Sequence, residues 1–285
     1  MKRLLVIVTL SLIIAAATGT KPGHAQEASA PGQQPPSSGA PQANPLKVAL
    51  LKWYPANLTT SFKVGEQPYG LAFDGANMWV SNNGDNTVTK LRASDGKKLG
   101  EFAVGQVPFN AAFDGEAIWV TNTQGASVTK LRASDGKVLG TFPDNGAPAG
   151  IVFDGTYVWV ANFDTVTRFK RDGTQAGTFK VARGLLTLAF DGADIWVPNN
   201  GGTVTKLRAS DGENLGTFGA GNADGSGIAF DGENLWLSGG DIVEMRPSDG
   251  KVLFQRPLNS SQQGVAFDGA NIWVAGWGAD SVFKL

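Results

Sequence analysis

The sequence contains no cysteine and a single histidine, His24. A chain without cysteine forms no disulfide bonds and offers no thiolate for a metal site or a lipid anchor. His24 lies within a predicted signal peptide, so the mature chain has no imidazole for acid/base catalysis or metal binding. These absences exclude many enzyme mechanisms. They favour a binding protein without a cofactor over an enzyme.

Long apolar runs are also scarce. The run at the start, "LLVIVTLSLIIAAA" from Leu4 to Ala17, follows two basic residues and precedes the small-residue pattern Gly23-His24-Ala25. This arrangement predicts a signal peptide over residues 1–25 and an exported protein, periplasmic or extracellular. Because the run is shorter than the roughly 20 residues of a membrane-spanning helix, we expect no membrane span in the mature protein.

Residues 26–45 contain no aromatic or branched aliphatic residue and are rich in Pro, Gln, Ser and Ala. Such a segment cannot bury enough apolar surface to offset its ordering entropy, which predicts a disordered linker, or alternatively a tether to the cell wall. Loss of Lys2, Arg3 and Lys21 with the signal peptide leaves 21 basic against 25 acidic residues, a net charge of −4. This balance disfavours nucleic acid as an obligate partner.

A motif of the form F-D-G-x-x-x-W recurs six times in residues 46–285. It begins at Phe73, Phe113, Phe153, Phe190, Phe230 and Phe267, with spacings of 40, 40, 37, 40 and 37 residues. A fixed period near forty residues is typical of propellers and solenoids, in which each repeat is one supersecondary unit.

Each repeat reads as four antiparallel strands. In the first, we expect strands over 70–73, 78–82, 86–93 and 98–104, joined by Asp-Gly turns. The apolar runs indicate sheets covered on both faces, as the blades of a propeller are. The last repeat stops after its third strand, while residues 59–65, "TTSFKVG", align with the fourth strand of the first repeat. We therefore predict an all-β, six-bladed propeller closed by this N-terminal strand, with residues 48–54 unplaced.

The segments "WVSNNGDNTVTKL" (Trp79 to Leu91) and "WVTNTQGASVTKL" (Trp119 to Leu131) resemble the YVTN-type β-propeller repeat of exported bacterial proteins, with Trp where that family often has Tyr. The resemblance implies the fold over nearly all of residues 46–285. It implies little about function, because propellers of this kind include surface-layer proteins, binding proteins and a few enzymes.

The residues that repeat unchanged are interpreted as structural. The tryptophans should form the core between blades, and the aspartates should stabilise the tight turns that they begin. The tryptophans are Trp79, Trp119, Trp159, Trp196, Trp236 and Trp273, and the aspartates are Asp74, Asp114, Asp154, Asp191, Asp231 and Asp268. Ligand-stacking tryptophans, and catalytic or calcium-binding aspartates, are the alternatives. The Lys-Leu-Arg segments at Lys90, Lys130 and Lys206 indicate solvated charges on the third strands.

Sequence variation is concentrated in the connections between the second and third strands and between successive blades. These connections share one face of the predicted disc, here called the variable face, and such variation usually marks the binding side. The candidate ligand-binding residues are Tyr69, Asn82, Phe109, Asn122, Asn162, Phe163, Asn199 and Trp277. The four asparagines either cap their strands or form a polar ring near the channel mouth.

The sequence is compatible with two functions. The first is an exported, monomeric, non-catalytic propeller that binds a glycan, peptide or protein. The second resembles the six-bladed lactonases, which implies Ca²⁺ at the central channel, with Asn82, Asn122, Asn162, Asn199, Asp164 and Asp241 as possible ligands. No catalytic residue stands out from the repeat. A lyase like the streptogramin-inactivating propellers is disfavoured, because that family relies on a histidine.

Overall fold

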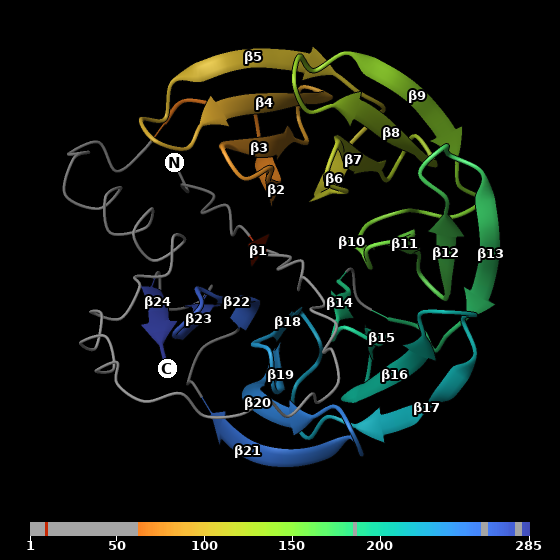
Figure 1. The fold of residues 1–285 in the computed structure, drawn as a ribbon. Helices are drawn as coiled ribbons and strands as arrows, with labels where there is room; N and C mark the ends of the chain where they lie inside the picture. The colour runs from red at the N-terminus through yellow and green to blue at the C-terminus, as the bar shows by residue number, and fades with distance from the viewer. Residues whose placement is uncertain (1–8, 11–61, 185–186, 258–261, 277–280) are drawn as a thin grey trace, which may run out of the picture. The chain divides into compact units, whose positions relative to one another are not determined.

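The computed structural model describes residues 9–10, 62–184, 187–257, 262–276 and 281–285. The described residues between 62 and 285 form the six-bladed β-propeller predicted from the repeat, with antiparallel blades arranged around a central axis (Figure 1). In each blade the first strand lies nearest the axis and the later strands follow outward (Figure 1). None of the described residues belongs to a helix that is long and apolar enough to cross a membrane.

The strands follow the repeat closely. Blades 1 and 2 contain β2 (Pro68–Phe73), β3 (Asn77–Asn82), β4 (Thr87–Arg92), β5 (Lys98–Ala103), β6 (Pro108–Phe113), β7 (Ala117–Asn122), β8 (Ser127–Arg132) and β9 (Val138–Pro143). Blades 3 and 4 contain β10 (Ile151–Phe153), β11 (Val158–Ala161), β12 (Thr165–Phe169), β13 (Gln175–Lys180), β14 (Ala189–Phe190), β15 (Asp194–Asn199), β16 (Thr203–Arg208) and β17 (Asn214–Gly219). Blades 5 and 6 contain β18 (Gly227–Phe230), β19 (Leu235–Ser238), β20 (Asp241–Arg246), β21 (Lys251–Pro257), β22 (Gln262–Phe267), β23 (Ile272–Gly276) and β24 (Ser281–Lys284).

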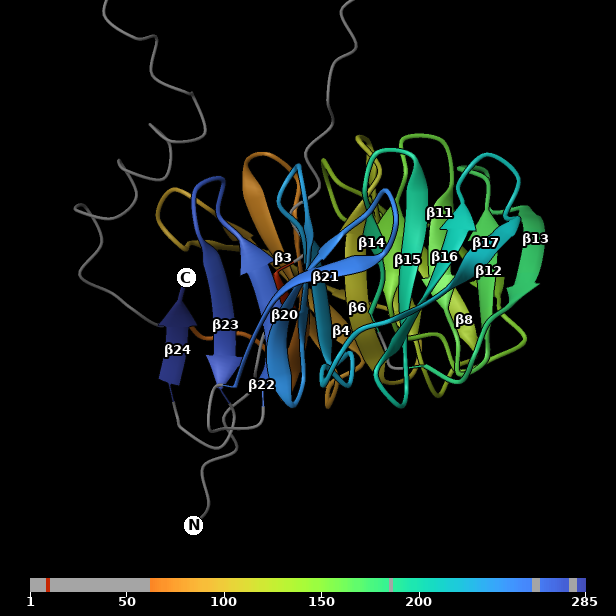
Figure 2. The same cartoon turned by 90° about the horizontal axis from the view of Figure 1, so that it is seen from below.

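The connections lie at the two opposite faces of this ring (Figure 2). On one face, the glycine of every F-D-G turn has a positive φ, between 91° and 101°. Glycine populates this region without steric cost, which explains the Asp-Gly pair at each hairpin. The turns between the third and fourth strands lie on the same face, here called the turn face.

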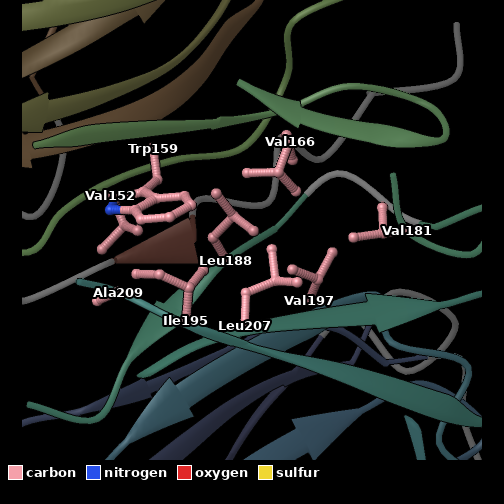
Figure 3. Close-up of a cluster of buried hydrophobic side chains, with 10 residues drawn as sticks. Val152, Trp159, Val166, Val181, Leu188, Ile195, Val197, Leu207 and Ala209 are labelled. Atoms are coloured by element: carbon pink, nitrogen blue, oxygen red, sulfur yellow. The ribbon is translucent and has the colours of Figure 1, made fainter. Parts of the chain in front are cut away.

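The core lies between neighbouring blades. Figure 3 shows one cluster, in which Trp159 and Val166 of blade 3 pack with Ile195 and Leu207 of blade 4. Within blades 1 to 4, the repeated tryptophan also packs against the phenylalanine of the fourth strand, with ring centroids 5.5 to 5.7 Å apart. Burial of these aromatic side chains contributes much of the hydrophobic stabilisation.

The predicted ring closure rests on contacts of Phe62 and Gly65. The ring of Phe62 lies over Gly96 of blade 1, as Phe102 of blade 1 lies over Gly136 of blade 2. The Gly65 amide donates to Asn82, as the Gly105 amide donates to Asn122. Phe62 and Gly65 therefore contact blade 1 as the fourth strand of a preceding blade does, which is the position that the sequence alignment predicts. The rest of the predicted strand, residues 59–61, lies outside the described residues, as do residues 48–54.

A two-residue strand, β1 (Thr9–Leu10), pairs in parallel with β2, with Thr9 opposite Gly70. It falls within the predicted signal peptide. The rest of that segment and all of the predicted linker lie outside the described residues, so both assignments remain predictions.

Candidate ligand-binding face

The aspartates of the F-D-G turns, on the turn face, accept hydrogen bonds from groups of their own blades. In each of the six F-D-G turns, one aspartate oxygen accepts a hydrogen bond from the tryptophan indole five residues later, at 2.6 to 2.8 Å. The other oxygen accepts backbone N–H groups of the turn, as Asp114 does from Glu116 and Ala117. Four of the tryptophans, Trp79, Trp119, Trp159 and Trp196, are fully buried, whereas Trp273 is 37% exposed. The polar groups of these side chains are therefore used within the fold.

Acid should weaken this arrangement. Burial raises the pKa of Asp268, but hydrogen bonds from Trp273, Asn271 and the turn backbone outweigh it and lower the pKa from 3.8 to about 2. The folded state then binds fewer protons than the unfolded state, so this stabilisation is complete above about pH 4 and lost as pH falls toward 2. We expect the melting temperature to fall across that window, and Asp268→Asn to flatten the fall. An unchanged pH profile in the variant would contradict this.

The lysines of the Lys-Leu-Arg segments are largely buried, which corrects their interpretation as solvated charges. Lys90 is only 6% exposed, and its ammonium donates to the carbonyl of Ala133 in the next blade. Lys130 and Lys206 make the same link to Arg171 and Pro247. In blades 1 to 5 a β-bulge lies beside this position, with its extra residue on the fourth strand, as Leu99 is in blade 1.

Each of these lysines also lies over the tryptophan of its own blade, with Nζ 4.9 Å from the ring centroid. In blade 3 the position holds Arg168, whose guanidinium donates to Ala209 and Ser210 and lies over Trp159. The arginines of the segments are different, because they pair with turn aspartates at the surface, as Arg132 does with Asp135. The segments thus join neighbouring blades through their lysines.

The asparagines that end the second strands are buried. Asn82 donates to the hydroxyls of Thr87 and Thr89 and accepts from the Gly65 amide. Asn122 contacts Ser127, Thr129 and Gly105 in the same way, and Asn199 contacts Thr203 and Thr205. With their polar groups engaged, these three side chains cap their strands rather than form an open ring.

A calcium ion at the channel does not fit these residues. Three of the asparagines in the proposed ligand set already have hydroxyl and backbone partners. Asp164 and Asp241 belong to blades 3 and 5, and Asp241 is 8% exposed and accepts a hydrogen bond from Gln255. Within the described residues, no three His, Cys, Asp or Glu side chains come together as a metal-binding group.

Two aromatic residues of the predicted set come together where innermost strands begin. Tyr69 is the second residue of β2 and Phe109 the second residue of β6, and their ring centroids are 3.8 Å apart. Both side chains are partly exposed, and burial raises the pKa of the Tyr69 phenol. The pair spans blades 1 and 2 beside the variable face.

The backbone before each of these aromatic residues is strained. Gln67 and Val107 have φ values of 50° and 56°, in the left-handed region that β-branched residues such as valine rarely adopt. Each precedes a proline, and each carbonyl accepts an N–H from the variable loop of its own blade, at Asn83 or Thr123. Strain of this kind persists only where surrounding contacts impose it, and it clusters at functional sites.

Blade 3 departs from the repeat at the variable face. Its loop between β11 and β12 is a tight turn closed by a hydrogen bond from the backbone N–H of Asn162 to the Thr165 carbonyl. Phe163 at the tip is 50% exposed, and the Arg183 guanidinium lies 4.9 Å from its ring centroid. Of the predicted ligand-binding residues, Tyr69, Phe109 and Phe163 thus present exposed surface. Trp277 lies outside the described residues.

Asp144, which follows β9 and is only 3% exposed, was not among the candidates from the sequence. Burial raises its pKa, although hydrogen bonds from Asn162 and Thr167 act in the opposite direction. A signal was available, because the alignment of repeats places Asp144 where the others have Val104, Val181 or Ala220.

Comparison with known proteins supports the fold and leaves the function open. No protein-family model matches the chain, and no curated protein sequence matches it. Among solved structures, it is similar to a chain of Kuenenia stuttgartiensis hydrazine synthase, with a TM-score of 0.68 and 17% sequence identity. The match covers 80% of this chain and 78% of that chain. At this identity the likeness shows a shared fold alone.

Proposed function

We propose that this chain is an exported, monomeric, non-catalytic propeller of the YVTN type that binds a glycan, peptide or protein outside the cytoplasm through its variable face. The observation that supports this most directly is the Tyr69–Phe109 pair, whose ring centroids lie 3.8 Å apart at the start of two innermost strands. Aromatic rings present large, rigid contact surfaces at low entropic cost, which suits both sugar rings and peptide side chains.

Two further observations support a role in binding. The backbone before each ring is held in the left-handed region, at Gln67 and Val107, so the fold imposes the position of the pair. Phe163 adds an exposed aromatic side chain on the same face, with Arg183 against its ring. An exposed large aromatic side chain with a charged neighbour is a common feature of binding surfaces.

The experiment is a screen of residues 26–285 against a glycan array and a displayed-peptide library, followed by titration of each hit. We expect Tyr69→Ala and Phe109→Ala to weaken binding at least tenfold, because aromatic side chains at the centre of an interface carry much of its energy. Leu139→Ala is the matched control, since Leu139 is 44% exposed on the outer strand β9. Hits that bind both aromatic variants as tightly as the unchanged protein would contradict the proposed site.

A further inference from the structure

Asp144 occupies a position that is aliphatic in the other blades. Its amide donates to the Ala126 carbonyl, as the Val104 amide donates to Asn86 and the Val181 amide to Asp164. The backbone is therefore in the same place, and only the side chain differs. Burial of a carboxylate is costly unless it is paired with a positive charge, neutralised by a proton or bound to a metal ion.

In the part of the chain that the structure describes, no cation pairs with this carboxylate. None of the ion pairs between described residues involves Asp144. Its side-chain partners are neutral. The side-chain Nδ2 of Asn162 lies 3.2 and 3.3 Å from the two carboxylate oxygens, and the Thr167 hydroxyl donates to one of them at 3.1 Å. The charge is thus solvated by dipoles alone, between β9 of blade 2 and β12 of blade 3.

Asn162 supplies a second, independent sign of a missing partner. Its side chain is 6% exposed and its Oδ1 has no hydrogen-bond partner. In blades 1 and 2 the corresponding oxygens of Asn82 and Asn122 accept a backbone N–H. A buried polar atom without a partner calls for an explanation such as a bound water or ion. Exchanging Oδ1 and Nδ2 of Asn162 would turn the oxygen toward Asp144 and Thr167. Because Oδ1 has no hydrogen-bond partner where it now lies, the exchange breaks no hydrogen bond made by that oxygen.

We propose that Asp144, Asn162 and Thr167 bind a calcium ion at the junction of blades 2 and 3. With the amide reversed, an Asp144 oxygen, the Asn162 oxygen and the Thr167 hydroxyl form a triangle with sides of 3.1 to 3.3 Å. Neighbouring oxygens bound to calcium at about 2.4 Å are separated by roughly 2.8 to 3.4 Å, and the sides of the triangle fall within this range.

The chemistry of the site fits a weak extracellular calcium site. Carboxylate, amide and hydroxyl oxygens are hard ligands, and water completes the six to eight positions that calcium takes. With one carboxylate, the dissociation constant should be on the order of 1 mM, as in extracellular modules. Asn145 and Ala147, beside the site, are exposed and give water and ions a route in. The bound ion would fix the base of the turn that presents Phe163.

The test measures the melting temperature of residues 26–285 at pH 8, with 10 mM CaCl₂ or with chelator, and the stoichiometry by calorimetric titration. We expect one calcium per chain and a rise of about 3 to 5 °C, which corresponds to a roughly tenfold shift in the folding equilibrium. Asp144→Asn and Asp144→Val should abolish both, because the charged ligand is lost. Asp164→Asn, which changes a partly exposed carboxylate on the neighbouring turn, should retain both.

Two results would overturn the proposal. An equal calcium response in Asp144→Val, which restores the aliphatic residue of the other blades, would place the ion elsewhere. No response in the unchanged protein, together with a higher melting temperature for Asp144→Asn, would indicate a carboxylic acid that stays protonated in the fold. Circular dichroism of each variant verifies that it folds, and MgCl₂ tests whether the site requires the larger cation.

Discussion

Replacing Trp119 with alanine is expected to lower the free energy of unfolding by about 3 to 5 kcal/mol. The side chain is fully buried, and its ring lies 5.6 Å from that of Phe142. Its loss leaves a cavity between blades and removes the indole N–H from Asp114, a carboxylate that is 1% exposed. A buried acceptor deprived of its donor adds its own desolvation cost. Urea unfolding followed by far-UV circular dichroism measures the change.

Two variants separate the contributions. Trp119→Phe keeps an aromatic ring and loses only the indole N–H and part of the area, so a cost of about 1 to 3 kcal/mol is expected. Trp273→Ala changes the same repeat position where the side chain is 37% exposed, and its cost should be clearly smaller. Equal costs for Trp119→Ala and Trp273→Ala would contradict the link between burial and stability at this position.

The fold could be predicted from the sequence because one pattern is repeated six times. An ambiguity in any single strand is removed when the same residues recur with the same spacing, as in the segments that begin at Trp79 and Trp119. Turn chemistry added the strand boundaries, since Asp-Gly pairs occur where the backbone requires a positive φ. Local and global signals agree throughout most of the chain, which is typical of foldable sequences.

The environment of individual side chains could not be predicted as well. Lys90 and Arg92 alternate with Leu91 as surface residues would, but the neighbouring blade covers Lys90, whose ammonium donates to the Ala133 carbonyl there. Sequence periodicity identifies which residues share a face of a strand, but it does not show that a neighbouring blade covers that face. The strain at Val107 likewise has no signature in the sequence, because long-range hydrogen bonds impose it.

The candidate site was predicted in part. Variation between repeats directed attention to one face, on which Phe163 is exposed and Tyr69 packs against Phe109. The same reasoning included Asn82 and Asn122, whose burial depends on hydroxyls across the loop that no single-chain pattern identifies. Asp144 was accessible in principle, as a charged residue in an otherwise aliphatic column of the alignment. Whether Tyr69 and Phe109 bind a ligand remains a prediction.

Replacing Gly136 with alanine should have the second large effect, because backbone and packing both oppose it. Gly136 has a φ of 75°, and an added Cβ would fall inside contact distance of the Phe102 ring from the preceding blade. The same ring already lies against Gly100 of its own strand and packs on Trp79, so it cannot move aside. The same contact recurs at five blade junctions, at Gly96, Gly136, Gly173, Gly212 and Gly250.

Gly155→Ala is the matched control, since Gly155 has a φ of 96° but nothing within 4 Å of an added Cβ. It should cost about 1 to 2 kcal/mol for the backbone alone. Gly136→Ala should cost about 2 to 5 kcal/mol, because overpacking adds to the same strain. The double variant Phe102→Ala/Gly136→Ala should then be less destabilised than the sum of the single changes, because removal of the ring removes the clash. Additive costs, measured by urea unfolding, would mean that the phenylalanine does not close the junction between blades in the way that these contacts indicate.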